Sequence, residues 1–313
     1  MTDRTGFIGL GNMGGRMTRR LVDGGVAVLG FDMRREAVEE AGATPADSSV
    51  AVLASSDVVF LSLPDSRVVE RVVLQDPGFL EGLRPGMVVV DLSTAAPSST
   101  TTISGELAAR GVAYLDAGIS GGAAAADKGG LTLMVGGDPE ALDRVRPLLA
   151  HFATGVHHMG ASGAGHSMKL LNNFLNAISL SATAEVMVAA KKAGLDLDTV
   201  LEVLNTSSGV NFATLNRFPK IIHGDYLKGG LTNALMTKDV VLYVDHLHEL
   251  GVTSLNASGP LASFGLANSL GYADAISNTV VDAIGDVSGR IRLHDAHDPD
   301  DADADSDSET RTA

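Results

Sequence analysis

The sequence contains no cysteine. A chain without cysteine has no disulfide, no thiolate nucleophile and no zinc site built on sulfur ligands. This absence fits a reducing compartment. Long apolar runs are also missing, because none approaches the roughly 20 residues that a membrane-spanning helix needs. We see no signal peptide, since an apolar strand-like run begins at Gly6, and we expect a cytoplasmic protein.

Metal-binding and nucleic-acid-binding patterns are missing as well. The histidines form no HExxH motif, and none is spaced with partners that would make a metal site, so we expect no metal. The formal net charge of -15 argues against nucleic acid as a partner. Much of that charge lies in residues 294–313, which we expect to be a disordered acidic tail because it has almost nothing apolar to bury. Metal binding by His294 and His297 with their acidic neighbours is the weaker interpretation of this tail.

A glycine motif of the form GxGxxG follows the first apolar run, at Gly9-Leu10-Gly11-Asn12-Met13-Gly14. The first glycine allows a tight strand-to-helix turn, the second lets the backbone approach a pyrophosphate at the helix N-terminus, and the third lets the helix pack on the strand. Asp32 ends the second apolar run and would accept hydrogen bonds from an adenosine ribose. This combination predicts a dinucleotide site.

The residues after the second run bear on the choice of cofactor. A carboxylate at Asp32 favours a free 2′-hydroxyl and repels a 2′-phosphate, so we expect NAD. Arg34 and Arg35 follow closely and could reach a phosphate, which keeps NADP open. The other interpretation of these two arginines is a solvated loop.

The pattern of predicted elements divides the chain into two parts. The first half alternates helical patterns with apolar runs typical of buried parallel strands, at 6–10, 26–31, 58–63, 87–91, 112–116 and 131–135. This alternation is typical of an α/β doubly wound sheet of the Rossmann type. After about Met159 a long helical stretch runs from His166 to about Ala193, and only helical patterns follow. We therefore expect a dinucleotide-binding domain at 1–161 and an all-α domain at 162–293, entered by one long helix.

The long helix carries a polar stripe with helical spacing, formed by Lys169, Asn172, Asn173 and Asn176. Its apolar neighbours are expected to be buried; they are Leu170, Leu171, Phe174, Leu175 and Ile178. A lysine there must be paired or lie in a cleft, and its pKa can fall far enough for acid or base chemistry. Structural hydrogen bonding at an interface is the alternative that the spacing leaves open.

A second polar cluster is the segment Asp116–Gly122, in which Ser120 follows a predicted strand. Free backbone N–H groups and a hydroxyl in such a turn can hold a carboxylate. Gly118, Ser120 and Gly122 also match the GxSxG elbow of serine hydrolases. We reject that match, because an elbow needs a helix directly after the serine and we expect the chain to continue into another strand.

The remaining polar residues are less specific. The segment Asp91–Thr94 ends a predicted strand, where ligands bind in open α/β sheets. Lys238-Asp239 alone indicates a surface pair on a helix. His157 and His158 look structural, whereas His166 could line a substrate pocket or end a helix.

Taken in order, four segments resemble the β-hydroxyacid dehydrogenase family, typified by 3-hydroxyisobutyrate dehydrogenase. They are FIGLGNMGGRM, DAGISGGAAAADKGGLTLMVGG, GAGHSMKLLNN and LMTKDV, which resemble the cofactor signature, the substrate loop, the catalytic motif and a C-terminal Lys-Asp signature. The resemblance implies an NAD(P)-dependent dehydrogenase that oxidises the hydroxyl of a small β-hydroxy acid. It also implies a homodimer or homotetramer built on the helical domain.

The resemblance assigns roles to individual residues. It implies that Lys169 is the catalytic acid and base, that Asn173 orients the substrate, and that Lys238 lines the cleft. The substrate carboxylate would be bound by Ser120, Gly121 and Gly122, and further cofactor contacts would come from Leu63, Pro64, Thr94 and Lys238. Two positions depart from the family pattern: Gly118 stands where proline is usual, and Leu231 where an aromatic residue is frequent.

Two alternative functions also have to be compared with these motifs. An NADPH-dependent semialdehyde or imine reductase would use the same fold, but imine reductases usually lack the lysine found at 169, and Asp32 is unfavourable for the semialdehyde reductases. The second alternative is a noncatalytic scaffold that binds a cofactor. Such a scaffold needs no lysine at 169, so the presence of Lys169 argues against it.

Overall fold

The structure is a computed structural model that describes residues 3–227 and 230–294, so the predicted acidic tail lies outside the described residues except for His294. The chain forms two compact units. The first unit contains the chain up to Leu175 and the segments Gly229–Leu231 and Lys238–Ala257. The second contains the segments Asn176–Lys228 and Thr232–Thr237 and the chain from Ser258. The domain limits expected from the sequence stay predictions.

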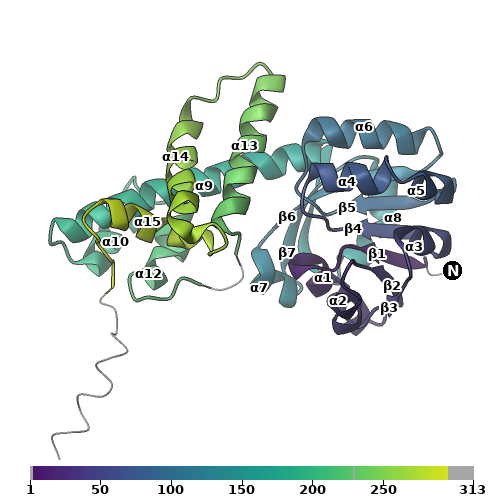
Figure 1. The fold of residues 1–313 in the computed structure, drawn as a ribbon, viewed down its shortest axis with the longest axis horizontal. Helices are drawn as coiled ribbons and strands as arrows, with labels where there is room; N and C mark the ends of the chain where they lie inside the picture. The colour runs from purple at the N-terminus through teal and green to yellow at the C-terminus, as the bar shows by residue number, and fades with distance from the viewer. Residues whose placement is uncertain (1–2, 228–229, 295–313) are drawn as a thin grey trace, which may run out of the picture. The chain divides into compact units, whose positions relative to one another are not determined.

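The first unit is built on an eight-stranded sheet in the order β3-β2-β1-β4-β5-β6-β7-β8 (Figure 1). All neighbouring strands run parallel except β6 and β7, which are antiparallel. The predicted doubly wound sheet is confirmed. The strands are β1 (Thr5–Ile8), β2 (Val28–Phe31), β3 (Thr44–Pro45), β4 (Val58–Leu61), β5 (Val88–Asp91), β6 (Ala113–Ser120), β7 (Leu131–Gly136) and β8 (Ala153–Gly160).

Two of these strands were missed by the sequence analysis. Strand β3 has only two residues, too few for an alternating pattern to show. Strand β8 is the outermost strand beyond β7, and most of its side chains are partly or fully exposed, so it has no apolar run.

Helices cover both faces of this sheet (Figure 1). They are α1 (Asn12–Asp23), α2 (Arg35–Glu40), α3 (Ser49–Ser55), α4 (Ser66–Val73), α5 (Pro77–Gly82), α6 (Pro97–Ala108), α7 (Gly122–Asp127) and α8 (Pro139–Leu149). Successive strand residues point to opposite faces, so Phe7 and Ile8 belong to two different apolar clusters. The first cluster stacks Phe60 on Phe7 and sets it edge-on to Phe152, with ring centroids 5.7 and 6.0 Å apart.

The second unit is helical, as expected. It contains parts of the 29-residue helix α9 (Ala164–Lys192) and of α13 (Asn233–Glu249). The other helices beyond α9 are α10 (Leu197–Asn205), α11 (Phe212–Asn216), α12 (Phe218–Ile221), α14 (Ser258–Ala267) and α15 (Val280–Val287), with short turns η1 (Leu255–Ala257), η2 (Asn268–Tyr272) and η3 (Ser277–Thr279). Across residues 3–227 and 230–294, no helix combines the length and the apolar character needed to cross a bilayer.

The N-terminal end of α9 begins directly against strand β6. The first N–H groups of a helix have no partner within the helix. Buried Asp116 of β6 provides one, because its carboxylate accepts hydrogen bonds from the backbone N–H groups of Gly163 and His166, both at 2.8 Å. A Cβ atom on Gly165 would lie 2.4 Å from the carbonyl oxygens of Asp116 and Met134, so only glycine fits there. This contact fixes where α9 starts on the sheet.

We predict that Asp116→Ala lowers the free energy of unfolding by about 3 kcal/mol, because it leaves two buried N–H groups without acceptors. Urea unfolding measures this loss. The matched control is Asp138→Ala, which removes an exposed N-cap of α8 that accepts a hydrogen bond from the Glu140 N–H at 2.9 Å. We expect the control to lose about 1 kcal/mol. Equal losses in the two variants would contradict this account of the start of α9.

Candidate active site

The glycine loop between β1 and α1 has the geometry that its spacing predicts. Gly9 has a φ of +88°, a left-handed conformation that favours glycine. A Cβ atom on Gly14 would lie 1.9 Å from the carbonyl oxygen of Gly9, so α1 packs directly on the loop. A Cβ atom on Gly11 would meet nothing within 4 Å, and the N-terminus of α1 has no side-chain cap. The loop therefore leaves open space and unbound N–H groups where a pyrophosphate would bind.

Asp32 lies directly after β2, beside the glycine loop. Its Oδ2 accepts a hydrogen bond from the Leu10 N–H at 2.8 Å, and its Oδ1 accepts one from the Arg34 N–H at 2.9 Å. A carboxylate has about four acceptor positions, so two remain for ribose hydroxyls. Arg35 is paired with Glu39 of its own helix at 3.1 Å. These residues fit the adenosine end of a dinucleotide.

The other predicted cofactor residues come together at the carboxyl ends of β4 and β5. The Nζ of Lys238, from α13, donates to the carbonyl oxygens of Pro64 at 3.2 Å and Thr94 at 3.5 Å. The Leu63 N–H donates to the hydroxyl of Ser93 at 2.9 Å, which ties the two strand ends to each other. Open α/β sheets bind ligands at this edge.

Lys169 is buried on α9, with 8% of its surface exposed. Its Nζ donates to the Oδ1 of Asn173 at 2.9 Å, and the Nδ2 of Asn173 donates to the Oδ2 of Asp239 in a short hydrogen bond. This role of Asp239 was not predicted, and the expected surface pair is wrong, because Asp239 is 1% exposed. The Lys238-Asp239 motif was the available signal, but only the packing of α13 on α9 shows where the carboxylate lies.

The burial expected around the polar stripe is only partly right. Leu170 and Phe174 are buried as expected, whereas Leu171 is 37% and Leu175 is 64% exposed. Leu171 and Leu175 are four residues apart and share a face of α9 that the described chain does not cover. Further contacts join α9 to α13: the rings of Phe174 and Tyr243 stack with centroids 4.0 Å apart, and the Ser167 hydroxyl lies 2.7 Å from Nε2 of His246.

Burial lowers the pKa of Lys169 from 10.5 to about 8. The negative charge of Asp239 opposes this change and raises the pKa, whereas the positive charge of Lys238 lowers it. A lysine with a pKa near 8 exists in both protonation states close to neutral pH. Such a side chain can accept a proton from a hydroxyl or return one to an oxyanion.

Ser120 lies at the end of β6, on the face that carries Asp116 and Gly118, because alternate strand residues share a face. Gly118 lies against the Lys169 stem, so this face of β6 is the one that faces the lysine. Gly121 and Gly122 follow with φ values of +122° and +67°. They form the tight turn into α7 that the predicted carboxylate loop needs.

The expectation that no helix follows Ser120 is wrong, since α7 begins at Gly122. The run of four alanines from Ala123 favours a helix, but six residues are too few for a helical period to show. A serine hydrolase would still need a base at Ser120, and no histidine of the described chain is hydrogen-bonded to that side chain. Helix α7 is instead tied to the glycine-loop helix, because Asp127 forms an ion pair with Arg16 of α1.

His166 is fully buried and cannot line a substrate pocket. Its Nδ1 lies 2.7 Å from the hydroxyl of Thr100, which places the imidazole between α6 and the start of α9. His158 lies on the exposed strand β8, with its Nε2 2.8 Å from the carbonyl oxygen of Gly137. Within residues 3–227 and 230–294, no group of three or more histidine, aspartate or glutamate residues is arranged to hold a metal ion.

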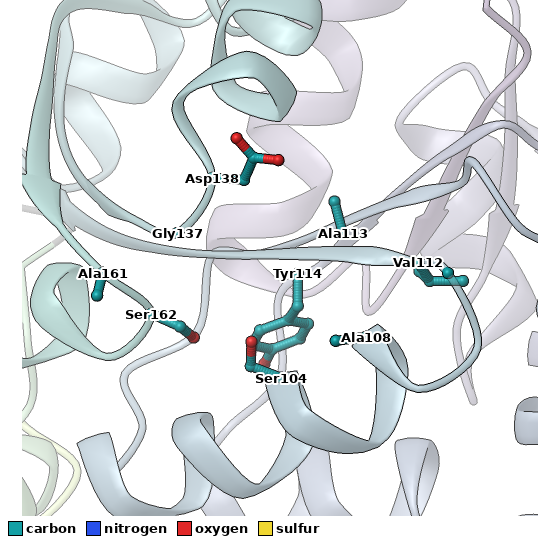
Figure 2. A pocket seen from close by; sticks show the side chains of 10 residues that line it. Ser104, Ala108, Val112, Ala113, Tyr114, Gly137, Asp138, Ala161 and Ser162 are labelled. Carbon is teal, nitrogen blue, oxygen red and sulfur yellow. The ribbon is translucent and has the colours of Figure 1, made fainter.

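A surface hollow of about 530 Å³ lies elsewhere on the first unit (Figure 2). Figure 2 shows Tyr114 and Ser104 on one side of strand β6 and Asp138 on the other. The Tyr114 hydroxyl donates to the Oδ2 of Asp91 at 2.7 Å and is therefore not free for a ligand. None of the predicted site residues lines this hollow, so it is separate from the predicted site.

A sheet of this order, a glycine loop with an acidic partner and a buried titrating lysine define a dinucleotide-dependent oxidoreductase. Two family models match the chain: the NAD-binding domain of 6-phosphogluconate dehydrogenase over residues 4–160, and the NAD-binding domain of NADP-dependent 3-hydroxyisobutyrate dehydrogenase over residues 163–281. Together they include all the predicted site residues.

Curated relatives agree with these models. The chain is 36% identical to 2-(hydroxymethyl)glutarate dehydrogenase of Eubacterium barkeri, over 77% of this chain and 81% of the relative. It is 37% identical to NAD-dependent L-serine dehydrogenase of Pseudomonas aeruginosa, over 86% and 93%. A solved structure of Mycobacterium tuberculosis 3-hydroxyisobutyrate dehydrogenase with L-serine is 31% identical, with a TM-score of 0.83, and the match covers 90% of this chain and 98% of that one.

The chain therefore belongs to the β-hydroxyacid dehydrogenase family. Within it, the protein is an NAD(P)-dependent 3-hydroxyacid dehydrogenase. An imine reductase from Myxococcus stipitatus is 17% identical with a TM-score of 0.62, a likeness that concerns the fold alone.

We predict that Asp239→Asn lowers the pKa of Lys169 below about 8, because the charge that favours the ammonium is lost. An NMR titration of the Lys169 Cε signal, assigned by its loss in Lys169→Met, measures the change. Asp245→Asn, at an exposed position of the same helix, is the control and should leave the pKa of Lys169 unchanged. A rise in the Lys169 pKa of Asp239→Asn would contradict the assigned interaction.

Proposed function

We propose that this protein oxidises the primary hydroxyl of a small β-hydroxy acid to the corresponding 3-oxo acid, with Lys169 as the general base. The observation that carries the proposal is the buried Lys169, whose pKa of about 8 suits proton transfer near neutral pH and which faces the Ser120 strand. When bound, the nicotinamide supplies the acceptor for the hydride that leaves the hydroxyl-bearing carbon.

Lys169 acts on the substrate hydroxyl in both directions. In its neutral form the amine accepts the hydroxyl proton during oxidation. During reduction the ammonium returns that proton and stabilises the negative charge that develops on oxygen. Asn173 supports this role by accepting a hydrogen bond from Nζ, while its own amide is held by Asp239. We therefore assign Asn173 the task of orienting Lys169 and, through it, the substrate.

The substrate carboxylate is assigned to Ser120, Gly121 and Gly122. The serine hydroxyl is engaged in no hydrogen bond within the described chain, and two glycines with positive φ turn the backbone so that N–H groups can converge on an anion. This assignment places the carboxylate next to the Lys169 face of β6.

The substrates named for the relatives share one chemical unit. Serine, 3-hydroxyisobutyrate and 2-(hydroxymethyl)glutarate each carry a hydroxymethyl group on the carbon next to a carboxylate, and they differ in the other substituent of that carbon. We propose this unit as the substrate class here. We propose NAD as the preferred cofactor, because the Asp32 carboxylate would repel a 2′-phosphate.

We predict that Lys169→Met lowers kcat by a factor on the order of 10² to 10⁴, because the general base is removed. NAD reduction with a panel of 2-substituted 3-hydroxypropanoates measures the loss. The dissociation constant for NAD should stay unchanged, because the variant leaves the glycine loop intact. Lys220→Met, an exposed position in the second unit, is the control. Turnover near that of the unmodified protein would refute the role of Lys169.

We also predict that Asp32→Ala erodes the preference for NAD over NADP, since it removes both the ribose acceptor and the repulsion of a 2′-phosphate. The ratio of kcat/KM for the two cofactors is the measurement. Asp23→Ala, at the exposed end of α1, is the control. An unchanged ratio in Asp32→Ala would show that the carboxylate does not contact the ribose.

A further inference from the structure

Arg217 of the second unit is a guanidinium group held in place by two amides. It lies between α11 and α12, and its Nη1 and Nη2 donate to the Oδ1 atoms of Asn278 and Asn176, both at 2.8 Å. Asn278 is buried and is itself fixed, because its Nδ2 donates to the backbone carbonyl oxygen of Tyr226 at 2.7 Å. The guanidinium carbon lies 5.8 Å from the centre of the Phe212 ring. These contacts hold the guanidinium in one orientation.

Arg217 has no counter-ion among residues 3–227 and 230–294, because no carboxylate there forms an ion pair with it. Arg292 of the same unit differs, since it pairs with Asp286 at 2.6 Å and with Asp282 at 3.8 Å. Both acceptors of Arg217 are neutral, and burial lowers the pKa of this guanidinium below its ordinary value. Removing a charge from water is costly unless the charge is paired. The arrangement therefore favours an anion that comes from outside the chain.

The donors that such an anion needs are available. A guanidinium has five N–H groups in one plane, and Asn176 and Asn278 accept from only two of those of Arg217. The other three have no acceptor in the part of the chain that the structure describes. A carboxylate can accept two parallel hydrogen bonds from a guanidinium, and these charge-assisted bonds are stronger than bonds between neutral groups. Arg217 can therefore bind a carboxylate without losing its present contacts.

Helix α9 connects this arginine to the lysine. Lys169 donates to Asn173, whereas Arg217 donates to Asn176, which lies one helical turn farther along the same face of α9. Side chains three residues apart on a helix are neighbours, with Cβ atoms about 5–6 Å apart. The polar face of α9 therefore leads from the acid–base group to a cation without a counter-ion.

We propose that Arg217 binds a second acid group of the substrate, so that this enzyme prefers 3-hydroxy acids with a further carboxylate on the substituent of the α-carbon. This rests on the proposed function, in which the α-carbon bears the first carboxylate, the hydroxymethyl group and one variable substituent. A substituent with an ammonium or an apolar end leaves the guanidinium unpaired and is disfavoured. Arg217 is thus a specificity-determining residue.

Paired substrates test this preference in the unmodified enzyme. The panel contains the 2-(hydroxymethyl) derivatives of butanedioate, pentanedioate and hexanedioate, each beside the monoamide in which a neutral carboxamide replaces the distal carboxylate. We expect kcat/KM with NAD to be about 10- to 100-fold higher for the best diacid than for its amide, because a hydrogen-bonded charge pair forms. Equal values for every diacid and its amide overturn the proposal.

Variants then assign the preference to Arg217. Arg217→Met removes the charge, and Arg217→Lys keeps it without the two parallel donors. Arg292→Met is the control, because it removes an arginine of the same unit that has carboxylates of its own. We expect the preference for the diacid to vanish in Arg217→Met, to fall partly in Arg217→Lys and to persist in Arg292→Met. A merely structural role would lower kcat/KM for acid and amide alike, so an unchanged ratio in Arg217→Met overturns the assignment. If Arg217→Met does not fold, the ratio in Arg217→Lys decides.

A binding experiment separates this site from the proposed function. Succinate, glutarate and adipate are titrated into the protein with saturating NAD, each beside its monoamide. The Nε–H signal of Arg217, assigned by its loss in Arg217→Lys, is followed by NMR. We expect at least one diacid to move this signal and to bind about tenfold more tightly than its monoamide. Diacids that leave the signal in place overturn the anion site. If the signal moves but no hydroxy acid is oxidised, the proposed function fails while the anion site stands.

Discussion

The contact between the start of α9 and strand β6 is the constraint on which the site depends. One buried carboxylate, Asp116, binds the helix start, and glycines at 118 and 165 let helix and strand backbones meet without side chains between them. The helix therefore starts at one fixed place, and Lys169 lies one turn farther along it. The same strand ends in the Ser120 turn, so a single strand positions both Lys169 and the turn to which we assign the substrate carboxylate.

Helix α13 links this lysine to the loops after β4 and β5 through two consecutive residues, Lys238 and Asp239. Asp239 accepts a hydrogen bond from the amide of Asn173, and the same amide accepts one from the Lys169 amine. The neighbouring Lys238 donates to carbonyl oxygens in the loops after β4 and β5. Burial favours the neutral amine and Asp239 favours the ammonium, and the balance leaves both forms accessible. The acid–base property of Lys169 is thus set by the packing of two helices rather than by any single neighbour.

The sequence predicted what depends on local patterns. Six of the eight strands, the glycine loop with Asp32 and the long helix follow from periodicity and from residues with special backbone demands. What it could not predict depends on contacts between distant segments. Three features can be predicted only when it is known which elements pack together. They are the burial of Asp239, the exposure of Leu171 and Leu175, and the hydrogen bonds of Asp116 to the start of α9. The short helix after Ser120 was missed because six residues show little periodicity.

The depressed pKa of Lys169 also has a consequence for folding. The unfolded chain keeps a proton on this side chain up to about pH 10.5, whereas the folded chain releases it near pH 8. Between these values the unfolded state binds more protons, so the contribution of Lys169 to stability increases as the pH rises. Below pH 8 the fold carries a desolvated charge, at a cost on the order of 3 kcal/mol for the change in pKa. The residue assigned to catalysis is therefore one that weakens the fold under the conditions in which it works.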